Sequence, residues 1–156
     1  MRTAWKDIGH ICKTRKVKNR MNRETEERFV RTFIIRQQRE RLLLELGSPT
    51  RRQNGINRFC HDATALVIPQ TLACRGKLKR EEIKLFLLPH AERGMCYAIS
   101  SNEAVDGHFL SLSQALDSVL CFGFPSILVC AHAALVECEQ EQGPAEKLIL
   151  VERYKK

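Results

Sequence analysis

The stretch Ser118–Val136, SVLCFGFPSILVCAHAALV, decides how the rest of the chain is interpreted, because its 19 residues carry no formal charge. A helix of that length can cross a bilayer. However, Gly123 and Pro125 interrupt the middle, His132 lies inside, and acidic residues stand at both ends, where a membrane span usually has basic anchors. A helix end, a turn and buried strands explain the stretch better. We therefore expect no membrane span and no membrane partner.

Further strand and helix patterns surround this stretch. Short apolar runs typical of strands occur at 96–100, 109–110, 127–130, 134–136 and 148–151. Asp106-Gly107 is typical of a hairpin turn, 78–88 favours a helix, and Ser111 or Ser113 can cap another helix that reaches Leu120. The pattern predicts an α+β fold with a mixed or mostly antiparallel sheet of about four to five strands, covered on one face by one or two helices.

The N-terminal half favours helices. Asn22 can cap a helix whose apolar residues do not fall on one stripe, so the helix is either buried on several sides or breaks near Ile35. The segment Phe29–Ile35 also fits an extended conformation, because it is rich in β-branched and aromatic residues. Gly47-Ser48-Pro49 indicates a helix end followed by a second helix over 49–61, in which Asn54-Gly55 is a weak point.

These patterns suggest how the chain is organised. We expect a basic arm or frayed element at 1–22, then a single domain at 23–156. Its first part, 23–61, is expected to be helical, and its second part, 62–156, to contain the sheet.

Positive charge is concentrated in the first part of the chain. Residues 1–60 hold 16 Lys and Arg against 6 Asp and Glu, whereas residues 61–156 hold 10 against 12. The net charge of +8 therefore belongs to the N-terminal part. A field of that sign attracts polyanions, and nucleic acid, RNA or DNA, is the leading candidate partner. An acidic protein partner is the second candidate.

The basic residues expected to contact a polyanion lie in segment 13–20 and around the joint between the two expected helices. They are Lys13, Arg15, Lys16, Lys18, Arg20, Arg36, Arg39, Arg51, Arg52 and Arg58. Arginine suits bidentate phosphate contacts. Reversing the charges of Arg51 and Arg52 is expected to weaken binding and leave the fold intact. The alternative is a solvated helix face with internal pairs such as Arg41 with Glu45.

Cysteine, histidine and carboxylate patterns give no further site. Seven cysteines without framework spacing, and an N-terminus without an apolar run, favour free thiols in a reducing cytoplasm. Cys130 and His132 would share a strand face, but no Cys-x-x-Cys pair accompanies them, so we predict no metal and no cofactor. Glu137, Glu139 and Glu141 alternate and are expected to form one solvated strip.

The sequence thus favours a non-enzymatic cytoplasmic protein that binds a polyanion through its basic part. A protein-interaction module, such as a bacterial immunity or antitoxin protein, would also suit the size and the thiols. A nuclease or hydrolase is the third candidate class. It would need a cleft that gathers a carboxylate with one of four histidines, His61, His90, His108 or His132.

Overall fold

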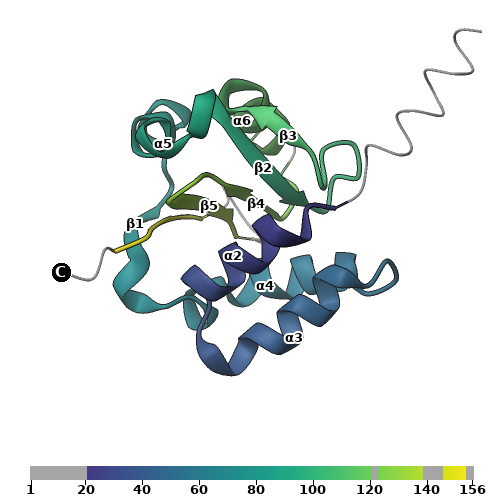
Figure 1. Cartoon of the computed structure of the whole chain (residues 1–156). Helices are drawn as coiled ribbons and strands as arrows, with labels where there is room; N and C mark the ends of the chain where they lie inside the picture. Colours follow the sequence, from purple (N-terminus) through teal and green to yellow (C-terminus); the bar gives the residue numbers. More distant parts are fainter. Residues whose placement is uncertain (1–20, 121–122, 139–145, 154–156) are drawn as a thin grey trace, which may run out of the picture.

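The structure is a computed structural model that describes residues 21–120, 123–138 and 146–153. These residues form a six-stranded antiparallel sheet, with strand order β1-β6-β5-β4-β2-β3, between two layers of helices (Figure 1). The strands are β1 Leu72–Gly76, β2 Met95–Ser100, β3 Phe109–Ser111, β4 Ser126–Val129, β5 Ala133–Glu137 and β6 Lys147–Val151. The expected α+β class is confirmed, with slightly more strands than expected.

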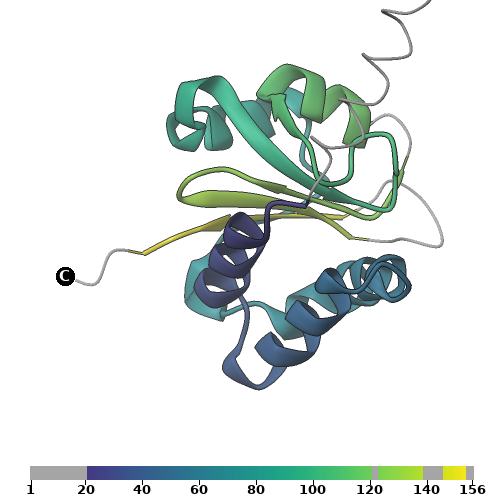
Figure 2. The same ribbon diagram turned by 45° about the vertical axis from the view of Figure 1, so that its right-hand side comes forward.

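Both faces of the sheet are covered, which corrects the expectation of helices on one face. Every residue of β4 and β5 is buried. Figure 2 shows α2, α3 and α4 on one face of the sheet and α5 and α6 on the other. Alternate side chains such as Ile127 and Val129 belong to the buried cluster with α2, α3 and α4, and Leu128 and Leu135 belong to the cluster with α5 and α6. Continuous apolar runs, rather than alternating ones, are what a sheet covered on both faces requires.

The first layer contains helices α2 Arg23–Phe33, α3 Arg36–Gly47 and α4 Arg52–Leu66. The side chain of Asn22 caps α2 by accepting a hydrogen bond from the Thr25 amide at 3.0 Å. The chain breaks between α2 and α3, where the Ile35 amide donates to the Leu66 carbonyl. The break near Ile35 is confirmed, whereas an extended strand from Phe29 is wrong because that residue lies inside α2.

Helix α4 begins and ends later than the sequence indicates, and Gly55 lies in its interior. A Cβ atom added at Gly55 would lie 2.6 Å from the Cβ atom of Glu45 in α3. The glycine therefore permits the two helices to approach closely. The residue that sequence patterns mark as a weak point is required by packing.

The second layer contains α5 Arg80–Leu87 and α6 Leu112–Leu120, with short 3₁₀ turns η1 Pro69–Thr71, η2 Leu88–His90 and η3 Glu92–Gly94. The Ser111 hydroxyl accepts a hydrogen bond from the Gln114 amide, as expected of a cap. The uncharged stretch contains the end of α6, then β4 and most of β5. No helix within the described ranges combines the length and apolarity that a bilayer crossing needs.

Candidate functional site

Arg52 is at the centre of a buried ion-pair network rather than on the surface. All five of its N–H donors are used: two bond to Asp106 at 2.7 and 2.9 Å, two bond to Glu26 at 2.6 and 3.1 Å, and one bonds to the Leu46 carbonyl at 2.9 Å. Its exposed fraction is 4%. The expectation that Arg52 contacts a polyanion is therefore wrong, because a phosphate can neither reach it nor find a free donor.

The same network ties the first helical layer to the sheet. Tyr97 of β2 donates its hydroxyl proton to Glu26 at 2.8 Å and accepts a hydrogen bond from the Asn22 amide at 2.9 Å. Burial and the negative charge of Glu26 raise the pKa of Tyr97. Burial acts to lower the pKa of Arg52, but its hydrogen bonds to Asp106 and Glu26 outweigh burial and raise it. Arg52 and Tyr97 therefore keep their protons, and the network holds its form near neutral pH.

Two further arginines of the expected interface bond within the fold. Arg58 pairs with Glu45 at 2.6 Å, and Arg39 donates to the Ile34 carbonyl at 2.9 Å. The expected pair between Arg41 and Glu45 is present at 3.2 Å. Burial opposes ionisation of Glu45, yet the guanidinium groups of Arg58 and Arg41 hold its pKa below the usual value. Much of the basic character around the α3–α4 joint is neutralised locally.

Arg36 and Arg51 are the exposed remainder of that interface. Neither makes an ion pair with a described residue. Arg36 begins α3, and Arg51 lies in the turn between α3 and α4. Lys13, Arg15, Lys16, Lys18 and Arg20 lie outside the described residues.

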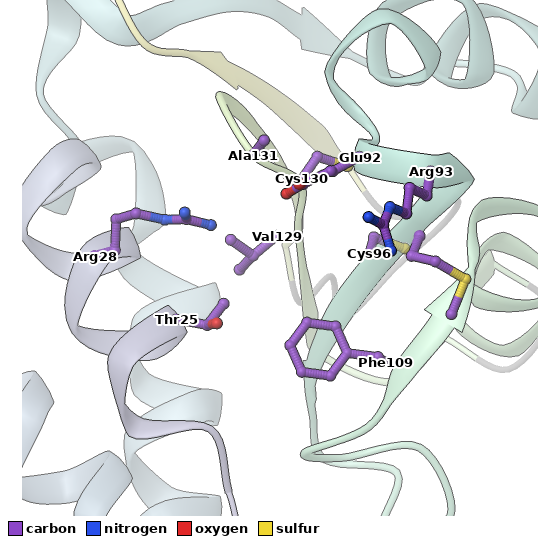
Figure 3. A pocket seen from close by; sticks show the side chains of 10 residues that line it. Thr25, Arg28, Glu92, Arg93, Cys96, Phe109, Val129, Cys130 and Ala131 are labelled. Atoms are coloured by element: carbon purple, nitrogen blue, oxygen red, sulfur yellow. The ribbon is translucent and has the colours of Figure 1, made fainter.

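A pocket of about 410 Å³ lies between α2 and the end of the sheet (Figure 3). Its walls come from α2, η3, the starts of β2 and β3, and the β4–β5 hairpin. Its lining residues are Thr25, Arg28, Glu92, Arg93, Met95, Cys96, Phe109, Val129, Cys130 and Ala131. The volume falls in the range of about 300–1,000 Å³ typical of ligand sites.

Two guanidinium groups point into this pocket from opposite sides, Arg28 from α2 and Arg93 from η3 (Figure 3). Both residues are exposed, and neither guanidinium group makes an ion pair with a described residue. Arg93 has a φ of 54°, the one positive φ at a described non-glycine residue. A backbone strained at a pocket rim is a common feature of functional sites. The pair can hold an anionic group such as a phosphate.

Phe109 supplies an aromatic wall to the pocket. Its exposed fraction is 51%, and its ring contacts that of Tyr97 with centroids 5.0 Å apart. A rigid, half-exposed ring is suited to stacking against a planar group. The pocket therefore combines two cationic groups with one stacking surface, and Glu92 is the carboxylate at its rim.

The pocket contains no constellation for acid–base or metal chemistry. None of the four histidines lines it, and His132 pairs instead with Glu152 at 2.9 Å. Within the described ranges, no group of three or more Cys, His, Asp or Glu could hold a metal ion. Cys130 is buried and His132 is exposed at the β4–β5 turn, so they do not share a strand face as the sequence suggested.

The expected solvated strip of glutamates also needs correction. Glu137 is buried, with an exposed fraction of 3%, and lies opposite Ser126 and Lys147 in the sheet. Burial raises its pKa to about 7, although the charge of Lys147 opposes the rise. Glu139 and Glu141 lie outside the described residues.

Sequence reasoning missed Arg28, Arg93 and Phe109. Arg28 lies in a charge-rich helix, where several basic residues look equivalent. Arg93 precedes Gly94, a turn signal that says nothing about where the arginine points. Phe109 could have been noticed. It follows the Asp106-Gly107 turn and is next to Leu110, and neighbouring side chains in a strand point to opposite faces, so one of these two apolar residues faces away from the other.

Comparisons with protein-family models, with curated protein sequences and with solved structures give no match to this chain.

Proposed function

We propose that this chain is a non-enzymatic nucleic-acid-binding protein that contacts the phosphate backbone of RNA or DNA. The observation that carries the proposal is the convergence of Arg28 and Arg93, both exposed and unpaired among the described residues, on one pocket. Guanidinium groups bind phosphate oxygens bidentately. Phe109 in the same pocket would stack on a base, a contact that tolerates any sequence because every base has a π-face.

The basic segment joins the folded part at Met21, at the start of α2. Residues 1–20 carry seven basic residues and one acidic residue, which leaves +6 of the net +8 in that segment. The segment continues into Met21, whose side chain lies against Gly107, and Asn22, whose amide donates to the Tyr97 hydroxyl. Tyr97 in turn contacts Phe109 of the pocket. The segment is therefore linked to the pocket through Asn22, Tyr97 and Phe109, and its charge would add sequence-independent phosphate contacts.

The test is fluorescence anisotropy of a labelled single-stranded RNA and a labelled DNA duplex, titrated with the full chain from about 50 to 300 mM salt. We expect micromolar or tighter binding that weakens steeply with salt. The variant Arg28→Glu/Arg93→Glu removes two charge-assisted contacts of about 1.5 kcal/mol each, so affinity should fall about 100-fold. Absence of binding at the lowest salt would refute the proposal.

A matched control separates the pocket from net charge. Arg36→Glu/Arg51→Glu changes the charge by the same amount, at exposed positions away from the pocket. We expect it to reduce affinity much less than the pocket variant does. If the two double variants lose affinity equally, binding follows overall charge and the pocket assignment is wrong.

The segment is tested in the full chain by replacing all five basic residues of 13–20 with Gln. We expect weaker binding to both nucleic acids and a shallower salt dependence, because fewer counterions are released. An unchanged salt slope would remove the segment from the interface.

A protein partner is the second candidate, in the manner of an immunity or antitoxin protein, and one observation favours it. Leu85, Phe86 and Leu88 are exposed at the end of α5, with exposed fractions of 74%, 40% and 51%. Neighbouring exposed apolar side chains are typical of interaction surfaces. This candidate predicts a stoichiometric complex with one protein that survives nuclease treatment and is lost in Leu85→Ser/Phe86→Ser.

A further inference from the structure

Cys96 and Cys130 form a cross-strand pair at the end of the sheet, beside the pocket. The register between β2 and β4 pairs Tyr97 with Val129 and Ala98 with Leu128. One step further along both strands, Cys96 lies opposite Cys130. Both side chains belong to the same buried cluster as Ala98 and Leu128, so they project from the same face of the sheet.

The backbone geometry places this pair at a non-hydrogen-bonded site. Ala98, two residues along from Cys96, exchanges hydrogen bonds with His108 and Gly107 on the β3 side, away from β4. The N–H and C=O groups of residues two apart in a strand point to the same neighbouring strand. The N–H and C=O groups of Cys96 therefore also point away from β4. The Cys130 amide donates to the Ala133 carbonyl in β5, away from β2. At such sites the two Cα atoms lie about 4.5 Å apart, within the range of about 4.4–6.8 Å that a disulfide spans.

The two thiols influence each other directly. A hydrogen bond from the Cys130 thiol lowers the pKa of Cys96 despite its burial. The pKa of Cys130 is raised by its hydrogen bond to Cys96, by burial and by the charge that forms there. The thiolate is the reactive form of cysteine, and a thiol whose pKa is lowered beside a second thiol is suited to disulfide formation.

The pair is almost closed to solvent, because Cys96 and Cys130 have exposed fractions of only 2% and 3%. Both residues border the pocket at the end of the sheet, but their side chains belong to the buried cluster on the α5–α6 face, whereas Arg28 lines the pocket from α2 on the other face. A hydroperoxide therefore reaches the two sulfurs through local opening at this end of the sheet.

We propose that Cys96 and Cys130 are a redox modification site that forms a reversible disulfide on reaction with a hydroperoxide. The Cys96 thiolate attacks the peroxide, the O–O bond breaks, and Cys96 becomes a sulfenic acid as one water or alcohol leaves. The Cys130 thiol then attacks that sulfur, the S–S bond forms, and a second water leaves. The two thiols are oxidised by two electrons and one peroxide is reduced, so atoms and electrons balance.

Other described cysteines lack this arrangement and serve as controls. Cys60 is buried in α4, on the opposite face of the sheet from the pair. Cys74 lies in β1 and is partly exposed. Burial and the charge of Glu146 raise the pKa of Cys138 to about 11, which makes its thiolate scarce.

The experiment uses the wild-type full chain, so no variant has to fold. The reduced protein is treated with hydrogen peroxide, remaining thiols are alkylated, and peptides are mapped by mass spectrometry. We expect a peptide linking Cys96 to Cys130, with loss of both free thiols and their recovery after treatment with a dithiol. Oxidation of Cys74 without this link would overturn the proposal, and so would links between other cysteines in preference to it.

A variant then assigns the roles of the two sulfurs. In Cys130→Ser the second step is blocked, so Cys96 should accumulate as a sulfenic acid that a dimedone-type probe captures. Cys74→Ser, at a partly exposed position outside the pocket, should leave the Cys96–Cys130 link unchanged. Equal probe capture at Cys96 in wild type and in Cys130→Ser would show that Cys130 does not resolve the intermediate and would refute the pair.

Discussion

Replacing Arg52 with Met is expected to cost more stability than any other single arginine substitution in the described part of the chain. The Arg52 side chain is 5% exposed, and its guanidinium bridges Glu26 and Asp106, which are almost as buried. Methionine fills a similar volume without a charge. The substitution therefore leaves two carboxylates next to each other in the interior with no cation between them.

The size of the effect follows from this geometry. Removing one partner of a buried ion pair typically costs about 3–5 kcal/mol, because the remaining charge stays buried and unpaired. A chain of this size has a free energy of unfolding of about 5–15 kcal/mol, so Arg52→Met should fold with little margin. Arg52→Lys should also be destabilised, because one ammonium group cannot supply the two bidentate contacts.

Urea denaturation measures this loss, and pH gives it a distinctive signature. Without Arg52, burial and mutual repulsion raise the pKa of a carboxyl in the folded variant above its unfolded value. The stability that protonation restores is present at low pH and disappears as pH rises through the raised pKa. The deficit should therefore be smaller at pH 5 than at pH 7.5.

Neighbouring Arg51 provides the control, because Arg51→Met changes the same residue type at an exposed position and should alter stability by about 0.5 kcal/mol or less. The triple variant Glu26→Gln/Arg52→Met/Asp106→Asn should regain most of the loss. If Arg52→Met costs no more than Arg51→Met, or if its deficit does not change with pH, Arg52 is not the centre of a buried network.

Two further substitutions test buried features. Burial raises the pKa of Glu137 to about 7 from an ordinary value near 4.5, so the folded state holds a proton that the unfolded chain releases. Stability should fall by about 3 kcal/mol as pH rises from about 4.5 to 7, and Glu137→Gln should flatten that slope in urea unfolding curves; an unchanged slope would contradict the assignment. Gly55→Ala would raise the free energy of unfolding by about 1 kcal/mol from helix propensity alone, but its Cβ atom would clash with Glu45. We therefore expect a net loss of stability of about 1–2 kcal/mol, measured by thermal unfolding. A gain in stability would show that α3 and α4 can separate.

The sequence predicts the central strands well and the edge strand β1 poorly, for one physical reason. The apolar runs at 127–130, 134–136 and 148–151 mark β4, β5 and β6, because a strand covered on both faces must be apolar at nearly every position. Strand β1, with sequence LACRG, alternates between half-buried and exposed residues and contains an arginine and a glycine. Its position is determined by pairing with β6 and not by its own composition.

The basic residues show which properties of a site the sequence does not predict. Arg51 and Arg52 are identical neighbours, yet one is exposed and the other is buried. A signal for burial exists, because Arg52, Ile56, Phe59 and Ala63 recur at helical spacing and form the inner face of α4. The signal does not reveal the two carboxylates that make burial tolerable. Glu26 and Asp106 lie 26 residues before and 54 residues after Arg52, and only the fold brings them to it.

The buried network also bears on how any binding experiment is interpreted. Glu26 lies in the same helical turn as Arg28, and Arg52 holds that turn against the sheet through Glu26. Tyr97 bonds to Glu26 on one side and contacts Phe109 on the other. A substitution at Arg52 would therefore disturb the positions of Arg28 and Phe109 and weaken the proposed phosphate binding, although Arg52 itself does not touch the phosphate. Charge reversal at Arg51 and Arg52 cannot distinguish a lost contact from a displaced pocket, whereas paired reversals at exposed arginines can.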